Sequence, residues 1–231
     1  MAATVQDRLT TLSSGWARSG DRRAIFAQCY LIMTGRVREA IDAGEFVDGV
    51  WVTHLLDRFA DYYFDALDAH ASPDPPLPCP AVWVRAFDAC TDSRCHPLRA
   101  LLLGINAHIN HDLALAIVDV LEDWADLDEA TRETRRRDHE HVNSIIETTT
   151  DEVQRDVVAR WAPGTAILDV VLGPLDEWVF SIVVNSFRGN VWVDAMTVMA
   201  LPTDGRGATL IAIGRRADEV ADLLTFGRGR S

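Results

Sequence analysis

An apolar run at Pro97–Trp124, with a polar centre, constrains the fold more than any other part of the chain. Residues 101–103 are three leucines, and Leu113–Val118 is again apolar. A stretch this apolar, with no internal proline and far longer than a strand, predicts a buried central helix. Between the two apolar parts lie Asn106, His108, Asn110, His111 and Asp112. Burying such groups is costly unless they have partners, so the run marks a candidate site.

Apolar residues recur at three- and four-residue spacing through most of the remaining chain, which predicts a series of helices. The predicted helices span 4–17, 22–43, 48–71, 80–90, 97–124, 129–160, 165–186, 189–200 and 217–226, with a short apolar piece at 209–213 and a turn at 202–207. The prolines of residues 72–80 predict a loop, and Pro163-Gly164 predicts a break. No alternation of period two is long enough for a sheet, and no repeat of fixed period occurs. The prediction is an all-α fold, a single bundle-like domain of seven to nine helices over residues 1–231.

The composition narrows the classes of partner. The formal net charge of −13 argues against a nucleic-acid binder, which needs a basic face, and disfavours docking on anionic lipid. The N-terminus lacks the basic and apolar segments of a signal peptide, and the apolar stretches are interrupted by Asn, Asp or His before they reach membrane-spanning length. All 22 basic residues are arginine, which we interpret as codon bias of a GC-rich bacterium such as an actinobacterium. We therefore expect a cytoplasmic protein with no nucleic-acid or membrane partner.

The cysteines fit a reducing compartment. Cys29, Cys79, Cys90 and Cys95 show no CxxC spacing. Reduced thiols are the favoured interpretation, and a zinc clip from Cys90, Cys95 and His96 is the alternative.

His108 and Asp112 are four residues apart, so they share one face of the central helix. Such a pair has three possible roles. The Asp can orient the imidazole as a general base, both can ligate a metal, or they can satisfy each other structurally. Asn106 and Asn110 share a second face.

A second polar group, Asp138–Asn143, lies on the helix predicted over 129–160. Asp138 and His141 are three residues apart and share a face. An Asp-x-x-His on one helix opposite a His-x-x-x-Asp on another resembles the way that helical bundles assemble metal sites. In that case His108, Asp112, Asp138 and His141 would bind iron or zinc. The alternative for residues 138–141 is an exposed charged turn, because three arginines precede them.

Three further sequence features lie outside these two polar groups. Asp57, Asp61, Asp65 and Asp68 share one helical face, which we expect to be solvated; if that face met His108, Asp61 would be the extra ligand. Arg188 and Trp192 are four residues apart in an apolar segment. Arg188 is expected to pair with Asp112 or Asp138, or to stack on Trp192. Tyr62 and Tyr63 are core residues by default, with Tyr62 a candidate for substrate contact.

The run Gly104-Ile105-Asn106-Ala107-His108-Ile109-Asn110-His111-Asp112-Leu113 resembles the signature of the bacterial domain-of-unknown-function family 5995. Residues 59–67, Trp83 with Phe87, residues 138–143 and Arg188 with Trp192 agree in order. The resemblance spans about 24–201 and leaves 203–231 as a C-terminal extension. It implies no agreed activity. It implies that Asn106, His108, Asn110 and Asp112 belong to the family pattern with Asn143 and Arg188, whereas His111 and His141 are more particular to this chain.

Three functions follow as hypotheses. The first is a cofactor-independent cyclase, isomerase or lyase of specialised metabolism acting on a small molecule. Its catalytic residues would be His108, Asp112, Asp138 and His141, and its substrate-binding residues Asn106, Asn110, Asn143, Tyr62, Arg188 and Trp192. The second is a metal-dependent oxidase or hydrolase with a di-iron or zinc site. The third is a non-catalytic ligand-binding or structural protein. A homodimer is possible in each case.

Overall fold

The computed structural model describes residues 3–163 and 190–225, and among them the secondary structure is helix, with no strand. The all-α prediction is therefore confirmed. The elements are α1 (Val5–Ser19), α2 (Arg23–Asp42), α3 (Gly49–Ala71), α4 (Ala81–Thr91), α5 (Pro97–Asn106), η1 (Ala107–Leu113), α6 (Ala114–Val120), α7 (Glu129–Val153), η2 (Gln154–Val158), α8 (Ala159–Trp161), η3 (Thr203–Gly205) and α10 (Arg206–Thr225). Residues 190–199 form a further helical segment. η1 and η2 are π-helical and η3 is a 3₁₀ turn.

Local capping signals set several helix ends. The Thr4 hydroxyl accepts a hydrogen bond from the Asp7 N–H, and the Asp7 carboxylate accepts one from the Thr4 N–H, so α1 begins with a capping box. At the start of α3, where the sequence predicts a helix from residue 48, the Asp48 carboxylate accepts from the Trp51 N–H at 3.0 Å. Gly44, with φ +73°, follows the end of α2 in the left-handed conformation that glycine adopts without penalty.

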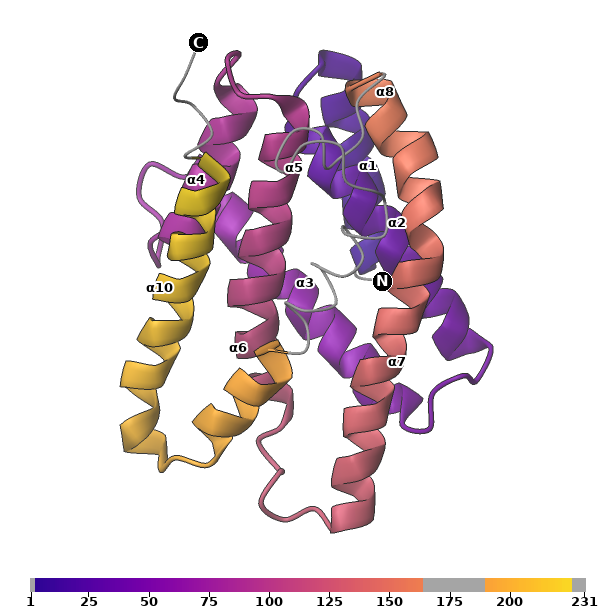
Figure 1. Ribbon diagram of the computed structural model, residues 1–231, viewed down its shortest axis with the longest axis vertical. Coiled ribbons are helices and arrows are strands. Elements are labelled where there is room, and N and C mark those ends of the chain that lie inside the picture. Colours follow the sequence, from indigo (N-terminus) through magenta and orange to yellow (C-terminus); the bar gives the residue numbers. More distant parts are fainter. Residues whose placement is uncertain (1–2, 164–189, 226–231) are drawn as a thin grey trace.

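α5, η1 and α6 follow one another as a single long helix through the middle of the molecule (Figure 1). α2, α3, α4 and α10 pack around this helix, and α7 packs against α2 and α3. Most of its apolar side chains are buried, including Leu98, Leu101, Leu113 and Ile117 at 0–1% exposure. Each such side chain contributes about 1.5–3 kcal/mol through removal of apolar surface from water. The predicted buried central helix is therefore confirmed.

This central helix also has the length of a membrane span. Pro97–Val120 is long and apolar enough to cross a membrane by length and composition, with a mean hydropathy of 1.4. Within the structure, however, 67% of its most apolar window is buried, as in the core helix of a soluble protein. The expectation of no membrane partner stays a prediction.

Some predicted boundaries differ from the structure. The piece predicted at 209–213 and the described part of the piece predicted at 217–226 belong to one helix, α10, which continues through Gly214. The central helix ends at Val120, and turns follow it, so the predicted end at 124 is four residues too far. The helix predicted at 165–186 lies outside the described residues.

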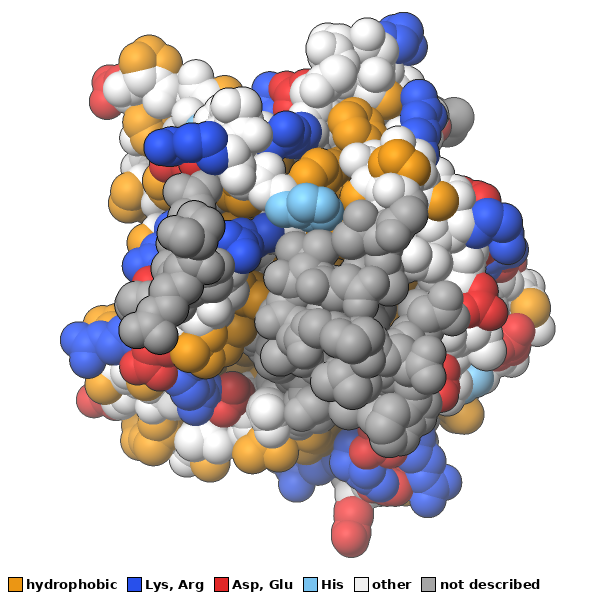
Figure 2. Space-filling view, turned by 45° about the horizontal axis from the view of Figure 1, so that its top comes forward, with side chains coloured by type: hydrophobic (Ala, Val, Ile, Leu, Met, Phe, Trp, Pro, Cys, Tyr) orange, Lys and Arg blue, Asp and Glu red, His pale blue; other side chains and the backbone are white. Residues whose placement is uncertain are grey.

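The surface carries mixed charges despite the acidic total. Figure 2 shows basic and acidic side chains interspersed over the face that it presents. Many of them pair, as Arg36 does with Glu39 and Glu152 at 2.8 Å. The carboxylates of Asp57, Asp61, Asp65 and Asp68 are all exposed, so this stripe is solvated as predicted and Asp61 lies away from the core.

Candidate functional site

The buried carboxylate of Asp112 lies at the centre of the site. It is 1% exposed and has three nitrogen partners. Its Oδ2 accepts from the Trp83 indole N–H at 2.9 Å and lies 3.2 Å from His108 Nδ1. Its Oδ1 lies 2.8 Å from His111 Nδ1. As a carboxylate, Asp112 only accepts, so both imidazoles carry their proton on Nδ1 in this arrangement. Three donors on one buried carboxylate offset the cost of removing its charge from water.

His108 lies in a box of aromatic rings. Its imidazole stacks on Phe59, with centroids 3.6 Å apart and planes 8° apart. Tyr30 packs edge-on at 4.4 Å, and Phe26 does so at 5.6 Å. The ring is only 4% exposed. Packing on its faces and the bond to Asp112 at Nδ1 together fix the orientation of the imidazole and therefore the direction of Nε2.

The local backbone accounts for this close packing. Residues Ala107–Leu113 form a π-helix, a rare form that occurs frequently at functional sites. One turn earlier stands Gly104, where a Cβ would lie 2.9 Å from Phe26 Cδ2. Only glycine lets the Phe26 ring approach the central helix this closely, and Phe26 is one wall of the aromatic box.

A cavity of about 140 Å³ lies beside His108. Its described lining comes from α2, α3, the central helix and α7, and it is almost entirely apolar. The lining residues include Phe26, Met33, Val37, Leu55, Phe59 and Ile146. The polar side chains among the described lining are His108, Cys29, Tyr30 and Thr34. The cavity therefore combines apolar walls with one oriented imidazole and a few small donors, which is the usual make-up of a small-molecule site.

Burial keeps the cavity's acidic groups neutral. It raises the pKa of the Cys29 thiol to about 12. Burial also raises the pKa of Tyr30 well above its usual value; the negative charge of Asp112 adds to the shift, and the neighbouring Thr34 hydroxyl opposes it. At neutral pH, Tyr30 is therefore an O–H donor and Cys29 a thiol, and the basic group among the described lining residues is His108.

Asn106 and Asn110 face away from this cavity. Asn110 donates to Asn106 Oδ1 at 2.8 Å, and Asn106 donates to the Ala217 carbonyl of α10 at the same distance. The predicted shared face is confirmed. These contacts join α10 to the central helix, so their geometry indicates a packing role; as substrate contacts the two residues stay a prediction.

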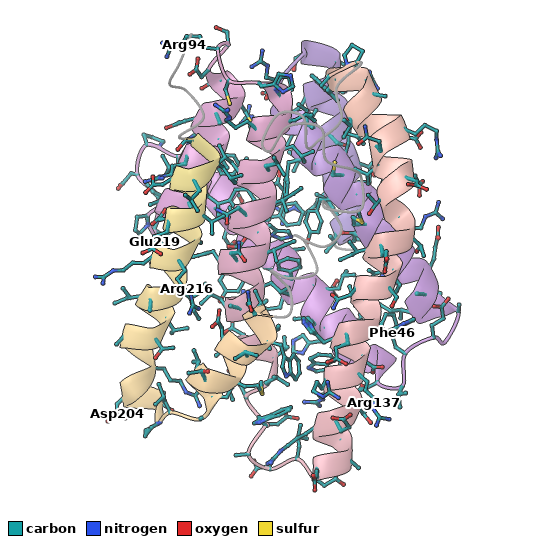
Figure 3. The ribbon with its side chains drawn as sticks, viewed as in Figure 1. Phe46, Arg94, Arg137, Asp204, Arg216 and Glu219 are labelled. Carbon is teal, nitrogen blue, oxygen red and sulfur yellow. The ribbon has the colours of Figure 1, made fainter. Side chains whose placement is uncertain are left out.

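Asp138 and His141 do not join His108 and Asp112. The buried Asp138 carboxylate accepts from the backbone N–H groups of Val47 at 3.1 Å and Asp48 at 2.7 Å. His141 is half-buried, lies 3.2 Å from Glu45 and packs against Phe46, which Figure 3 shows beside α7. The exposed charged turn is also wrong as an alternative, because Asp138 and His139 are buried. Asp138 instead holds the loop between α2 and α3 against α7.

The structure gives the proposed metal ligands no common centre. Among residues 3–163 and 190–225, no group of three or more His, Cys, Asp or Glu side chains is placed to hold a metal ion. Neither the site predicted from His108, Asp112, Asp138 and His141 nor the clip of Cys90, Cys95 and His96 is therefore assembled among these residues. Cys29, Cys79 and Cys90 are free thiols.

The remaining predicted contacts lie elsewhere. Tyr62 donates to Asp119 Oδ2 at 2.8 Å, beside Arg58. Trp192 packs against His139, Trp51 and Trp124. Neither residue lines the cavity. Asn143 is partly buried on α7, next to the cavity residue Val142, and Arg188 lies outside the described residues.

Sequence reasoning missed the residues that complete the site. The sequence spacing indicates no partner for Trp83 or His111, and in the structure both contact Asp112. Tyr30 and Thr34 of the cavity carried no predicted role, and Phe59 entered only as part of the family resemblance at 59–67. The available signal was their position on the apolar stripes of the helices at 22–43 and 48–71, and this signal marks burial without naming a partner.

Comparison with known proteins gives one match. Residues 2–226 match the family described as "Family of unknown function (DUF5995)". The match is wider than the predicted 24–201 and includes α10, which was expected to lie outside. No curated protein and no solved structure matches the chain. Because the family match covers nearly the whole sequence, the chain belongs to the DUF5995 family.

Proposed function

We propose that the protein is an enzyme that moves a proton on a small, largely apolar molecule bound in the cavity, with His108 as the base. One observation supports this most. Asp112 holds Nδ1 of an imidazole whose ring forms part of a cavity wall. A base needs a fixed tautomer with Nε2 as acceptor and a nearby charge that stabilises the imidazolium, and Asp112 supplies both.

The chemistry follows from the surroundings of the base. His108 Nε2 takes a proton from a substrate carbon, the C–H bond breaks, and its electron pair stays on the substrate. That pair then forms a new bond within the molecule or expels a leaving group, which corresponds to an isomerase, cyclase or lyase. The apolar walls exclude water and strengthen the attraction between the new imidazolium and Asp112. No cofactor is needed for such a step.

The cavity volume limits the substrate. An engineered protein cavity of about 150 Å³ takes up benzene. The present cavity of about 140 Å³ therefore suits a compact molecule of similar size. The net charge of −13 disfavours a strongly anionic substrate.

No structural observation favours the metal-dependent or the non-catalytic alternative over this proposal. The metal-dependent alternative loses its ligand set, because Asp138 and His141 lie apart from the central pair. The non-catalytic alternative shares the cavity with the proposal, so an experiment has to separate the two.

The experiment compares the small-molecule profiles of bacterial hosts that carry wild type, His108→Gln or no gene. We expect wild type to change the profile and His108→Gln to abolish the change. The variant should stay folded at the growth temperature of the host, with a melting temperature a few degrees lower because the contact with Asp112 is lost. His54→Gln is the matched control, because His54 is exposed on α3 and away from the cavity. If folded His108→Gln still changes the profile, His108 is not the base. If wild type leaves the profile unaltered, the non-catalytic alternative is favoured.

A further inference from the structure

Two buried hydroxyls lie in the wall of the cavity beside His108. Tyr30 is 8% exposed and Thr34 is 3% exposed, and both line the cavity. They stand one helical turn apart on α2, so their side chains lie on the same face. The centroid of the Tyr30 ring is 4.4 Å from that of His108.

By hydrogen-bond geometry neither hydroxyl has a partner within the described part of the chain, although the Thr34 hydroxyl lies close enough to the Tyr30 O–H to oppose the rise in the Tyr30 pKa. A buried polar group left unsatisfied costs about 1–3 kcal/mol, so such groups are rare unless something else satisfies them. Both residues line a space large enough for a small molecule, and the remaining described lining is apolar apart from His108 and Cys29. A ligand atom in the cavity is therefore the natural partner.

We propose that Tyr30 and Thr34 form an oxygen-binding subsite, so that the ligand of this cavity is a compact cyclic or branched ketone or aldehyde whose carbonyl oxygen accepts from both hydroxyls. A carbonyl oxygen has two lone pairs and can accept from two donors at once. The ligand needs no donor of its own and no charge, which agrees with the apolar walls. The inference rests on the proposed function only in using the same cavity.

A carbonyl bound at this subsite would also provide an acidic C–H proton for His108 to remove. Carbon atoms next to a carbonyl are the acidic ones in such a molecule. When His108 Nε2 takes that proton, the C–H electron pair moves into a new C=C bond and the carbonyl π pair moves onto oxygen. The developing oxyanion then receives the hydrogen bonds of Tyr30 and Thr34. Burial holds the pKa of Tyr30 well above its usual value, so its O–H remains in place as a donor.

The test uses two probes of nearly the same shape, cyclohexanone and methylenecyclohexane, which differ in carrying C=O or C=CH₂. Their dissociation constants are measured by ligand-observed NMR for wild type, Tyr30→Phe, Thr34→Val and the double variant. We expect the double variant to lose the preference for the ketone, with the ratio of the two constants falling on the order of tenfold. Comparing ratios cancels the unequal hydration of the two probes.

The control is Thr53→Val, which removes a hydroxyl that binds the Gly49 carbonyl on α3 outside the cavity. This variant should keep the wild-type ratio. Folding is not expected to fail in the cavity variants, because replacing an unsatisfied hydroxyl by an apolar group is nearly neutral or stabilising. Their melting temperatures should equal or exceed that of wild type.

The outcomes separate the two proposals. If both probes bind and the ratio is the same in wild type and the double variant, the oxygen subsite is wrong and the proposed base is untouched. If the ratio falls as expected while His108→Gln still changes the host's metabolite profile, the subsite stands and the base is wrong. If neither probe binds wild type, the cavity is not a ligand site and both proposals fail.

Discussion

Two regions of this protein contain nearly the same residues and differ in what they do. The central helix carries His108 and Asp112, and α7 carries Asp138 and His141, at helical spacings that place each pair on one face. In the first region a buried carboxylate holds imidazoles beside a cavity. In the second, the carboxylate accepts from two backbone N–H groups and the imidazole pairs with Glu45 near the surface. Residue type and spacing set which side chains share a face, and the packing around them sets the role.

The first way to test this contrast is to remove the central carboxylate, and it carries the largest expected effect. Asp112→Leu leaves the Trp83, His108 and His111 nitrogens without their acceptor in the core. We expect the free energy of unfolding to fall by about 3–5 kcal/mol, measured by urea denaturation. Trp83→Phe, which removes one of the donors and keeps an aromatic ring, should cost clearly less. An Asp112→Leu protein as stable as wild type would mean that the carboxylate network does not hold the core.

The corresponding change in the second region is Asp138→Ala. It removes the acceptor of the Val47 and Asp48 N–H groups and should lower the free energy of unfolding by about 1–3 kcal/mol. The Asp138 carboxylate does not line the cavity, so binding of methylenecyclohexane should stay within about twofold of wild type at a temperature where both proteins are folded. Loss of that binding would show that the two regions act as one site.

The helices and the local pairs could be predicted from sequence because their signals are local. Asp48 caps its own helix, Gly44 ends the preceding one, and His108 reaches Asp112 within a single turn. The contacts that define the roles are not local. Trp83 reaches Asp112 from another helix, and Asp138 binds backbone 90 residues away. His111 contacts its neighbour Asp112 inside a π-helix, whereas adjacent side chains on a regular α-helix point apart.

The buried thiol of Cys29 predicts that the stability of the protein depends on pH. Cys29 lines the cavity, and burial raises its pKa to about 12 from its ordinary value of 9.0. A raised thiol pKa means that the unfolded chain ionises first as the pH increases. The Cys29 contribution to stability is therefore complete below pH 9 and is lost as the pH rises from 9 toward 12.

The thiol therefore tests whether the cavity is closed to water. Native protein at pH 8 should leave Cys29 unmodified by iodoacetamide, as detected by mass spectrometry of peptides, and unfolding in urea should expose it. Cys29→Ala should make the loss of stability above pH 9 less steep than in wild type. Rapid labelling of Cys29 in the native protein would mean that water and solutes enter the cavity freely.

The smallest effect is expected for the imidazole of the second region. His141→Gln breaks only the contact with Glu45, and both side chains are partly exposed, so solvent screens the pair. We expect the free energy of unfolding to change by no more than about 0.5 kcal/mol.

His111→Gln provides the comparison, because His111 is largely buried and its partner Asp112 is fully buried. Losing that donor should cost about 1–2 kcal/mol, since a hydrogen bond to a buried charge is stronger than one at the surface. Urea denaturation of both variants at pH 7.5 measures the difference. Equal costs would mean that burial does not separate the two regions, and that the contrast between a surface contact and a built site does not hold.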